Sequence, residues 1–311
     1  MIARVLIGVF VVLTGIFVAL WTTFLPAKLD VPEGNGFKSV AVNPVEGVSI
    51  YGIKTGEITF SEATTFRGGS FSKQRNFNVG VIYIRHPRGD LMIDAGMGRS
   101  TAEHIKMLPW IFRKTHRIAP GKPAAEQLRD AGVDLQSVSG VLITHAHWDH
   151  VSGLEHFSHV PVFMPKEELD FIKSGNNMAL LAKQLIGSNY KLYEFKDGAY
   201  LGFEKSFDFY GDGSVVIVPA YAHTPGSVIV FVTVSDGKRY AFIGDLAWQK
   251  EGVDLPAEKP WPIRKQADFN DGVARKLLGH MHRLQKKVPG LIVVPAHDAR
   301  VWAILPGLAA R

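Results

Sequence analysis

Short runs of apolar residues alternate along this chain with longer stretches in which apolar positions recur every three or four residues. The short runs predict β-strands over Val79–Arg85, Asp90–Asp94, Gly140–Thr144, Val160–Met164, Val215–Pro219, Val228–Val234, Arg239–Ile243 and Leu291–Val294. The longer stretches predict helices over Thr101–Lys106, Ala124–Ala131, Lys166–Lys173, Met178–Leu185 and Phe269–Lys287. Such an alternation is typical of a layered α/β domain.

The first apolar run differs from the others because it is too long for a strand. No charged residue occurs from Val5 to Leu25, and a helix over this run would be about 31 Å long, enough to cross the hydrocarbon core of a bilayer. Trp21 lies near its far end, where an interfacial aromatic residue is expected. The run therefore predicts an uncleaved membrane anchor first, with a cleaved signal peptide or a buried helix as alternatives.

These features divide the chain into three parts. Residues 1–27 form the anchor or signal segment, 28–44 a linker rich in proline and glycine, and 45–311 one catalytic domain. Because Arg4 precedes the apolar run, we expect the N-terminus inside and the catalytic domain outside the cytoplasm, in the periplasm or the extracellular space. Cleavage would instead give a secreted protein.

Composition narrows the chemistry that this domain can perform. The chain is 46% hydrophobic and 21% charged, which excludes a disordered protein. Its formal net charge is +6, but no basic cluster with interleaved aromatic residues occurs, so no nucleic-acid partner is expected. Cysteine is absent, which excludes disulfides, a thiol nucleophile and cysteine-ligated metals. Any bound metal must therefore use His, Asp or Glu.

One hexapeptide concentrates such residues. The apolar run that ends at Thr144 leads directly into His145-Ala146-His147-Trp148-Asp149-His150. A solvated polar loop is the alternative, but histidine makes up only 12 of 311 residues, so this density is not expected by chance. Imidazole and carboxylate groups suit Zn²⁺, Fe or Mn, and two ions side by side would account for four ligands in one loop.

Three later segments have the same form, an apolar strand that ends in a potential ligand. They carry His223 in Ala-His-Thr-Pro-Gly, Asp245 in Gly-Asp, and His297 in Ala-His-Asp. In α/β folds, sites gather at strand ends of this kind.

In this order, the motifs resemble those of the metallo-β-lactamase-fold superfamily, from about Val79 to Trp302. The resemblance implies a four-layer αβ/βα sandwich with two divalent metal ions at the sheet edge, zinc first, with iron or manganese as alternatives. It implies that one ion is held by His145, His147 and His223, that the other is held by Asp149, His150 and His297, and that Asp245 bridges both.

Such a centre predicts a hydrolase. Two ions that share a water lower its pKa and supply a bridging hydroxide, while Asp149 is placed to accept and return a proton. Asp245 and the ending His297-Asp298…Trp302 resemble those of lactonase-like members, so we expect a small-molecule substrate with an ester-type bond, a lactone or related acyl ester first.

Position 248 departs from the lactonase pattern. Acyl-homoserine lactonases typically have Tyr three residues after the bridging Asp, and this chain has Trp248, whose indole N–H can donate. Tyr221, two residues before His223, is a potential substitute near the reacting group. Thioesterase activity of the glyoxalase II type, phosphodiesterase and β-lactamase activity, and a non-catalytic metal-binding protein remain alternatives. The sequence predicts no oligomeric state.

Several residues near these motifs have expected supporting roles. Thr144, Thr224 and Asp298 are candidates to orient ligands, and Asp94 is expected to fix a turn. The segment Met107–Lys114 joins apolar bulk to basic charge, and is either a packed loop, a lipid contact or a substrate lid. Phe60–Phe77 is expected to be a mobile rim loop.

Overall fold

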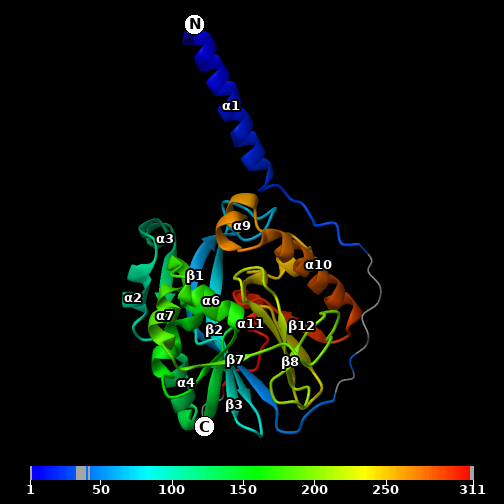
Figure 1. Ribbon diagram of the computed structural model, residues 1–311. Helices are drawn as coiled ribbons and strands as arrows, with labels where there is room; N and C mark the ends of the chain where they lie inside the picture. The colour runs from blue at the N-terminus through cyan, green and yellow to red at the C-terminus, as the bar shows by residue number, and fades with distance from the viewer. Residues whose placement is uncertain (1, 33–39, 41–42, 309–311) are drawn as a thin grey trace.

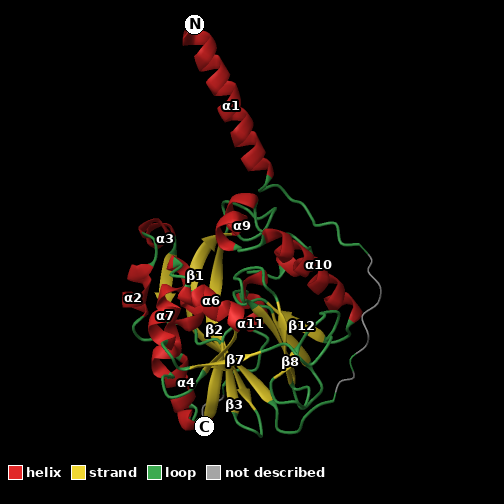
Figure 2. Cartoon of the chain, in the orientation of Figure 1, coloured by secondary structure: helices red, strands yellow, loops and turns green. Residues whose placement is uncertain are grey.

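The computed structural model describes residues 2–32, 40 and 43–308. Helix α1 (Ile2–Thr22) projects from one end of a layered domain, as Figures 1 and 2 show. Within the described part of the chain, Arg4–Thr22 is the one stretch long and apolar enough to cross a membrane, and none of it is buried against the domain. Length and composition alone do not distinguish an anchor from a signal sequence.

The domain contains two β-sheets. The first has the order β4-β1-β2-β3-β5-β6-β7, and the second has the order β12-β11-β10-β9-β8. The strands of the first sheet are β1 (Ser49–Ser61), β2 (Gln74–Arg85), β3 (Asp90–Ile93), β4 (Arg117–Pro120), β5 (Val138–Leu142), β6 (Val162–Pro165) and β7 (Tyr190–Tyr193). Those of the second sheet are β8 (Phe207–Asp208), β9 (Val215–Pro219), β10 (Val228–Thr233), β11 (Arg239–Phe242) and β12 (Leu291–Val294).

The helices of the domain lie over the outer faces of the sheets and around the ends of their strands (Figure 2). They are α2 (Thr101–His104), α3 (Trp110–Thr115), α4 (Ala124–Asp130), α5 (Trp148–Val151), α6 (Lys166–Lys173), α7 (Leu180–Ile186), α8 (Glu251–Asp254), α9 (Trp261–Ala267), α10 (Asp271–Lys287) and α11 (Ala299–Trp302). Of these, α11 packs against the core between the sheets. The longest helix of the domain, α10, begins where the Asn270 side chain accepts a hydrogen bond from Val273 N–H. It buries Leu278, Met281 and Leu284, which share one face at helical spacing.

Three apolar cores separate four layers. One lies between the first sheet and its helices, with Val141 and Leu128 fully buried. The second joins the two sheets, with Ile84 and Ile217 fully buried. The third lies between the second sheet and α10, with Met281 fully buried. This arrangement is the αβ/βα sandwich expected from the sequence.

The predicted strands and helices lie where expected, with ends displaced by a few residues. Four strands were missed: β1, β4, β7 and β8. The longest of them, β1, alternates buried residues with Gly, Thr, Lys and Glu, because its other face is partly open to solvent. It therefore lacks the continuous apolar run by which a strand buried on both faces is identified.

The prediction of a rim loop over Phe60–Phe77 is confirmed for residues 62–73, which connect β1 to β2, and was wrong at both ends. Its expected mobility stays a prediction. The first residues of the stretch end β1 and its last four begin β2, which pairs with β1 in an antiparallel register. Only the connection between the two strands is a loop, and Glu62 is buried there, where its carboxylate accepts from Ser70 N–H and pairs with Arg75. The glycines and polar residues of this stretch belong to that connection.

The described residues that follow α1 lie against the domain. Leu29 N–H donates to the Pro256 carbonyl at 3.0 Å, and Leu29 and Val40 pack against the core beneath α10. The remainder of the expected linker, residues 33–39 and 41–42, lies outside the described residues.

Candidate metal centre

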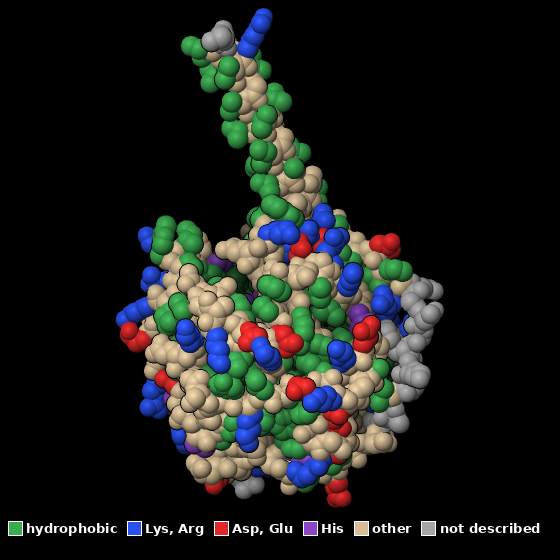
Figure 3. All heavy atoms as spheres, in the orientation of Figure 1, with side chains coloured by type: hydrophobic (Ala, Val, Ile, Leu, Met, Phe, Trp, Pro, Cys, Tyr) green, Lys and Arg blue, Asp and Glu red, His purple; other side chains and the backbone are tan. Residues whose placement is uncertain are grey.

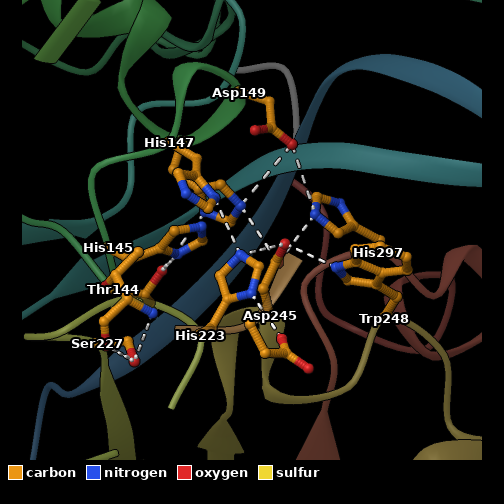
Figure 4. Close-up of polar contacts among 12 residues, drawn as sticks. Thr144, His145, His147, Asp149, His223, Ser227, Asp245, Trp248 and His297 are labelled. Atoms are coloured by element: carbon orange, nitrogen blue, oxygen red, sulfur yellow. Dashed lines mark hydrogen bonds and ion pairs between the residues drawn. The ribbon is translucent and has the colours of Figure 1, made fainter. Parts of the chain in front are cut away.

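Four strands of the two sheets deliver the predicted ligands to one place. The hexapeptide His145–His150 follows β5 and enters α5, while His223, Asp245 and His297 follow β9, β11 and β12. Figure 4 shows these side chains converging from the different segments. All seven are at least nine-tenths buried, with exposed fractions from 1% to 9%.

The potential ligand atoms form three overlapping groups. In each group the atoms lie within 4.8 Å of one another. The groups are His145, His147 and His223; His145, His150 and Asp245; and Asp149, His150 and His297. The first and the third are the two three-residue sets implied by the resemblance.

Asp245 lies between these two sets, with one carboxylate oxygen facing each. Its Oδ1 lies 2.9 Å from His297 Nε2 and 3.3 Å from His150 Nε2. Its Oδ2 lies 3.4 Å from His223 Nε2. Because the two oxygens face different sets, this carboxylate is oriented as a bridging ligand requires.

Partners on the other ring nitrogen orient three of the imidazoles. His150 Nδ1 lies 2.8 Å from Asp94 Oδ2, His223 Nδ1 lies 3.0 Å from Asp268 Oδ1, and His297 Nδ1 lies 2.8 Å from the Asn78 carbonyl. Each contact leaves Nε2 directed into the cluster. Metal-binding histidines are held in this way, because the partner fixes both the tautomer and the plane of the ring.

The cluster also contains buried polar atoms that do not make the hydrogen bonds expected of buried polar groups. His145 Nε2 makes no hydrogen bond. His150 Nε2 and Asp245 Oδ1 have no hydrogen bond of good geometry either, and contact only other members of the cluster. An unsatisfied buried polar atom costs about 1–3 kcal/mol, so a bound cation that contacts these atoms would stabilise the cluster. Nitrogen and carboxylate oxygen atoms suit Zn²⁺, Fe or Mn. The residues present therefore fit divalent metal ions.

Electrostatics support the same interpretation. Burial holds the pKa of His145 and of His147 well below the usual value, so both rings stay neutral, the form that binds metal. Burial also opposes charge on His150, but nearby carboxylates, Asp94 first, hold the pKa of that imidazole well above its usual range. The pKa of Asp245 is well below its usual value despite burial, because His297 and His150 face it.

The two aromatic residues proposed near the reacting group behave differently. Trp248 lies beside the cluster, and its indole N–H donates to Asp245 Oδ2 at 2.9 Å. The Lys259 ammonium lies over its ring, 4.8 Å from the centroid. Tyr221 does not line the cavity above the cluster. Its ring packs 6.3 Å from that of Phe195, and burial raises its pKa, with Glu167 also contributing.

Two buried charged residues beside the cluster, Glu168 and Lys259, escaped the sequence analysis. Glu168 accepts from Ala146 N–H, Gly226 N–H and the Thr224 hydroxyl, and so ties the His145 loop to the His223 loop. Lys259 donates to the Asp245 carbonyl oxygen at 3.1 Å and to Asp268 at 2.7 Å. The residues next to Glu168 and Lys259 in the sequence form no motif that marks these two as site residues, because only the tertiary fold brings them to the site.

The residues expected to orient ligands do so in one case of three. The Thr144 hydroxyl donates to Asp94 and lies 3.2 Å from His145 Nδ1. Thr224 instead binds Glu168, and Asp298 caps α11 and accepts from Lys250 N–H. Asp94 has a left-handed backbone with φ of 60°. Its carboxylate does not fix a local turn as expected, but contacts Thr144 and His150.

A cavity of about 380 Å³ lies above the cluster. His147, Asp149, His223, Asp245 and His297 form its polar floor. Its walls are mostly apolar and come from β1, β2, α3, α9 and the segment before α3, where the lining residues include Phe60, Phe77, Leu108, Phe112, Trp248 and Ile263. The site therefore joins a charged floor to an apolar chamber.

Comparison with known proteins agrees with the geometry. Residues 76–297 match the family model described as the metallo-beta-lactamase superfamily. The metallo-hydrolase mfmC of Annulohypoxylon moriforme is 21% identical over 184 residues. That match covers 56% of this chain and 49% of the fungal protein, so the chain spans about half the length of this curated relative.

Solved structures share the fold at low identity. An N-acyl homoserine lactone hydrolase, with the product N-hexanoyl-L-homoserine at its catalytic metal centre, is 18% identical with a TM-score of 0.64. The match covers 82% of this chain and 95% of that one. AidC, a dizinc quorum-quenching lactonase, is 17% identical with a TM-score of 0.54, over 85% and 91% of the two chains.

Proposed function

Because the chain belongs to the metallo-beta-lactamase superfamily of metal-dependent hydrolases, we propose that it binds two divalent ions and cleaves a lactone or related acyl ester. The observation that carries the proposal is the orientation of Asp245, whose Oδ1 faces His150 and His297 while Oδ2 faces His223. A single ion would need no such carboxylate between two sets of ligands.

His145, His147 and His223 would hold one ion, Asp149, His150 and His297 the other, and Asp245 both. Zinc is the first candidate, and the dizinc lactonase of the same fold supports this choice. Two ions bound there would supply hydroxide near neutral pH and polarise the scissile carbonyl. Proton transfer and positioning would be performed by the side chains around the cluster.

Asp149 is the proposed proton carrier. It lines the cavity beside the proposed ligands, where its carboxylate can accept a proton from a water that attacks a bound ester. Returning that proton to the departing alkoxide completes hydrolysis of the ester. Trp248 has a positioning role, since its N–H is engaged by Asp245 and therefore holds the bridging carboxylate rather than a substrate oxygen.

The cavity favours an acyl substrate. Phe60, Phe112 and Ile263 line the walls above the polar floor, so an apolar chain can be buried while its ester group meets Asp149. Burial of the chain displaces water, which contributes about 0.8 kcal/mol for each buried methylene. The lactone hydrolases that share the fold support this substrate class.

Replacement of the bridging carboxylate tests the proposal. We expect the full-length Asp245→Ala variant to lose at least one ion and nearly all lactone hydrolysis, as measured by plasma mass spectrometry and a product assay. Asp236→Ala is the matched control, because Asp236 lies in the exposed turn before β11, at the opposite end of the same strand. Full activity in Asp245→Ala would contradict the bridging role.

We further propose that α1 is retained as a membrane anchor with the catalytic domain outside the cytoplasm. Its length and hydropathy support this, as does the lack of burial of its side chains. An alternative is removal of this helix as a signal peptide, which N-terminal sequencing of the mature protein would reveal.

A further inference from the structure

The last turn of α1 is attached to the domain rather than hanging free. Trp21 stacks on Phe71 with 5.4 Å between ring centroids and 9° between planes. The Arg67 guanidinium donates to the carbonyls of Thr22 and Leu25, and Gly68 N–H donates to that of Phe24. These contacts fix the end of the helix to the connection between β1 and β2.

The same connection borders the catalytic cavity. Thr64 lines the cavity, and Arg67 N–H donates to the carbonyl of Glu258, shortly before α9. From α9, Ile263 and Ala267 line one wall, and α3 supplies the facing wall. Figure 1 shows α3 and α9 at the end of the domain from which α1 leaves. The walls of the cavity therefore flank the foot of the helix.

Around this foot, the surface is apolar and basic. Large apolar side chains are exposed there, with exposed fractions of 62% for Trp110, 50% for Ile111, 50% for Phe71 and 43% for Trp261. Figure 3 shows hydrophobic side chains at this end of the domain and Lys and Arg side chains around the base of α1. The exposed basic residues here are Lys28, Lys73, Arg113, Lys114 and Lys265. We define this surface, from Phe71 through α3 and α9, as the rim.

We infer that the rim rests in the headgroup region of an anionic bilayer, so that an acyl-chain amphiphile enters the cavity directly from the lipid. The inference rests on the proposed function and on retention of α1. Exposed Trp beside Lys and Arg is the composition of surfaces that lie in a membrane interface. Basic residues near such a surface are attracted to anionic lipid headgroups.

The attachment of α1 makes this contact unavoidable for an anchored chain. A flexible tether would let the domain turn away from the membrane, but here Arg67 contacts the carbonyl of Thr22, the final residue of the helix. With the last turn bound to the domain, the rim stays at the depth where the helix leaves the hydrocarbon. The opposite end of the domain, where Leu305 packs on Gly52 near the start of β1, points away from the bilayer.

Depth measurements on the full-length chain test the rim without any activity assay. Because the chain has no cysteine, Trp110→Cys and the matched control Ile304→Cys each accept one environment-sensitive fluorophore. Trp110 and Ile304 have similar exposed fractions, 62% and 66%, but lie at opposite ends of the domain. In nanodiscs of phosphatidylcholine and phosphatidylglycerol, a lipid-borne quencher should reduce the signal at position 110 and not at 304.

Two results would overturn the inference. One is equal insensitivity of both labels to the quencher. The other is a signal at position 110 that responds to protein concentration instead of lipid, which would identify the rim as an interface between copies of this chain. Neither result bears on hydrolysis, so the proposed function would stand even if the rim were not in the membrane.

A kinetic comparison tests the route of the substrate. Trp110 is not among the cavity-lining residues, so Trp110→Glu should leave hydrolysis of a short-chain soluble lactone unchanged. Its rate on a long-chain acyl lactone embedded in vesicles should fall about tenfold, equivalent to 1.4 kcal/mol of lost interfacial binding. Ile304→Glu should change neither rate. Equal rates for Trp110→Glu and wild type on the embedded lactone would contradict entry from lipid, whereas loss of both activities in all proteins would instead reject the proposed function.

Discussion

Replacing Asp94 by Asn tests a residue that orients a proposed metal ligand, His150, without being a ligand itself. The Asp94 carboxylate is buried and is not among the proposed metal ligands. It accepts from Thr144 N–H at 2.6 Å and from the Thr144 hydroxyl at 2.8 Å, and it lies 2.8 Å from His150 Nδ1. Asn preserves the size of the side chain and tolerates the left-handed backbone of this residue, with φ of 60°.

The magnitude follows from these contacts. An amide cannot supply the negative charge that stabilises the His150 ring, and one of its two polar atoms donates where Asp94 only accepts. Loss of such an outer partner costs about 10–100-fold in metal affinity, which corresponds to roughly 1.4–2.7 kcal/mol. The ion held by Asp149, His150 and His297 should bear most of this loss. The set with His223, which Asp268 orients, should be affected less.

The assay is titration of the metal-free, full-length protein with Zn²⁺ in competition with a chromogenic chelator, which resolves two binding constants. Asp212→Asn provides a matched control, because Asp212 Oδ2 lies 3.2 Å from His86 Nε2 in a similar pair remote from the cluster. Circular dichroism of both metal-free variants checks that the fold persists. Two unchanged binding constants in Asp94→Asn would refute the reasoning, as would an equal loss in the Asp212→Asn control.

Two further predictions concern the groups that hold the site together. Burial raises the pKa of Glu168 from 4.5 to about 7, so between these pH values the folded protein keeps a proton that the unfolded chain has released. The free energy of unfolding of wild type, measured by urea titration relative to Glu168→Gln, should therefore fall as pH rises from 4.5 to about 7. A difference between the two proteins that does not change with pH would contradict the raised pKa. Trp248→Phe removes the N–H that donates to Asp245. We expect kcat/KM for a lactone to drop about tenfold, which corresponds to about 1.4 kcal/mol, while the metal content is retained. An unchanged kcat/KM would show that the indole does not position the carboxylate.

The sequence was most informative where one residue both ended a strand and carried a ligand group. His145, His223, Asp245 and His297 each follow an apolar strand, and the fold brings them together because strand ends share one edge. These strands did not have to alternate apolar and polar residues to be recognised. Strands β10 and β11 are buried throughout, β9 is buried except at Pro219, and all three contain continuous apolar runs.

The sequence was less informative where structure depends on distant partners. Strand β1 is recognisable only beside β2, because half of its residues face solvent or other loops. Glu168 and Lys259 are invisible as site residues because nothing adjacent in sequence marks them, although both are buried at the centre. Trp248 was expected near the substrate, yet its hydrogen bond to Asp245 depends on a side-chain orientation that no local pattern specifies.

The cavity also depended on the tertiary structure. The segment Met107–Lys114 has both apolar and basic residues, and three different locations were compatible with its sequence. In the structure its second half is α3, with Trp110 exposed and Phe112 turned toward Phe60, 6.1 Å between ring centroids. One short helix thus lines the cavity on one side and presents apolar surface on the other.

The central claim is that two ions sit between these histidines and aspartates and hydrolyse an acyl ester. Metal content of the purified full-length chain, by plasma mass spectrometry, tests it most directly when the same sample is assayed on lactone, thioester, β-lactam and phosphodiester substrates. The account predicts about two ions per chain, as the two ligand sets require, and a lactone as the preferred substrate. Protein that contains no metal, and that gains no activity on addition of Zn²⁺ or Mn²⁺, would contradict it.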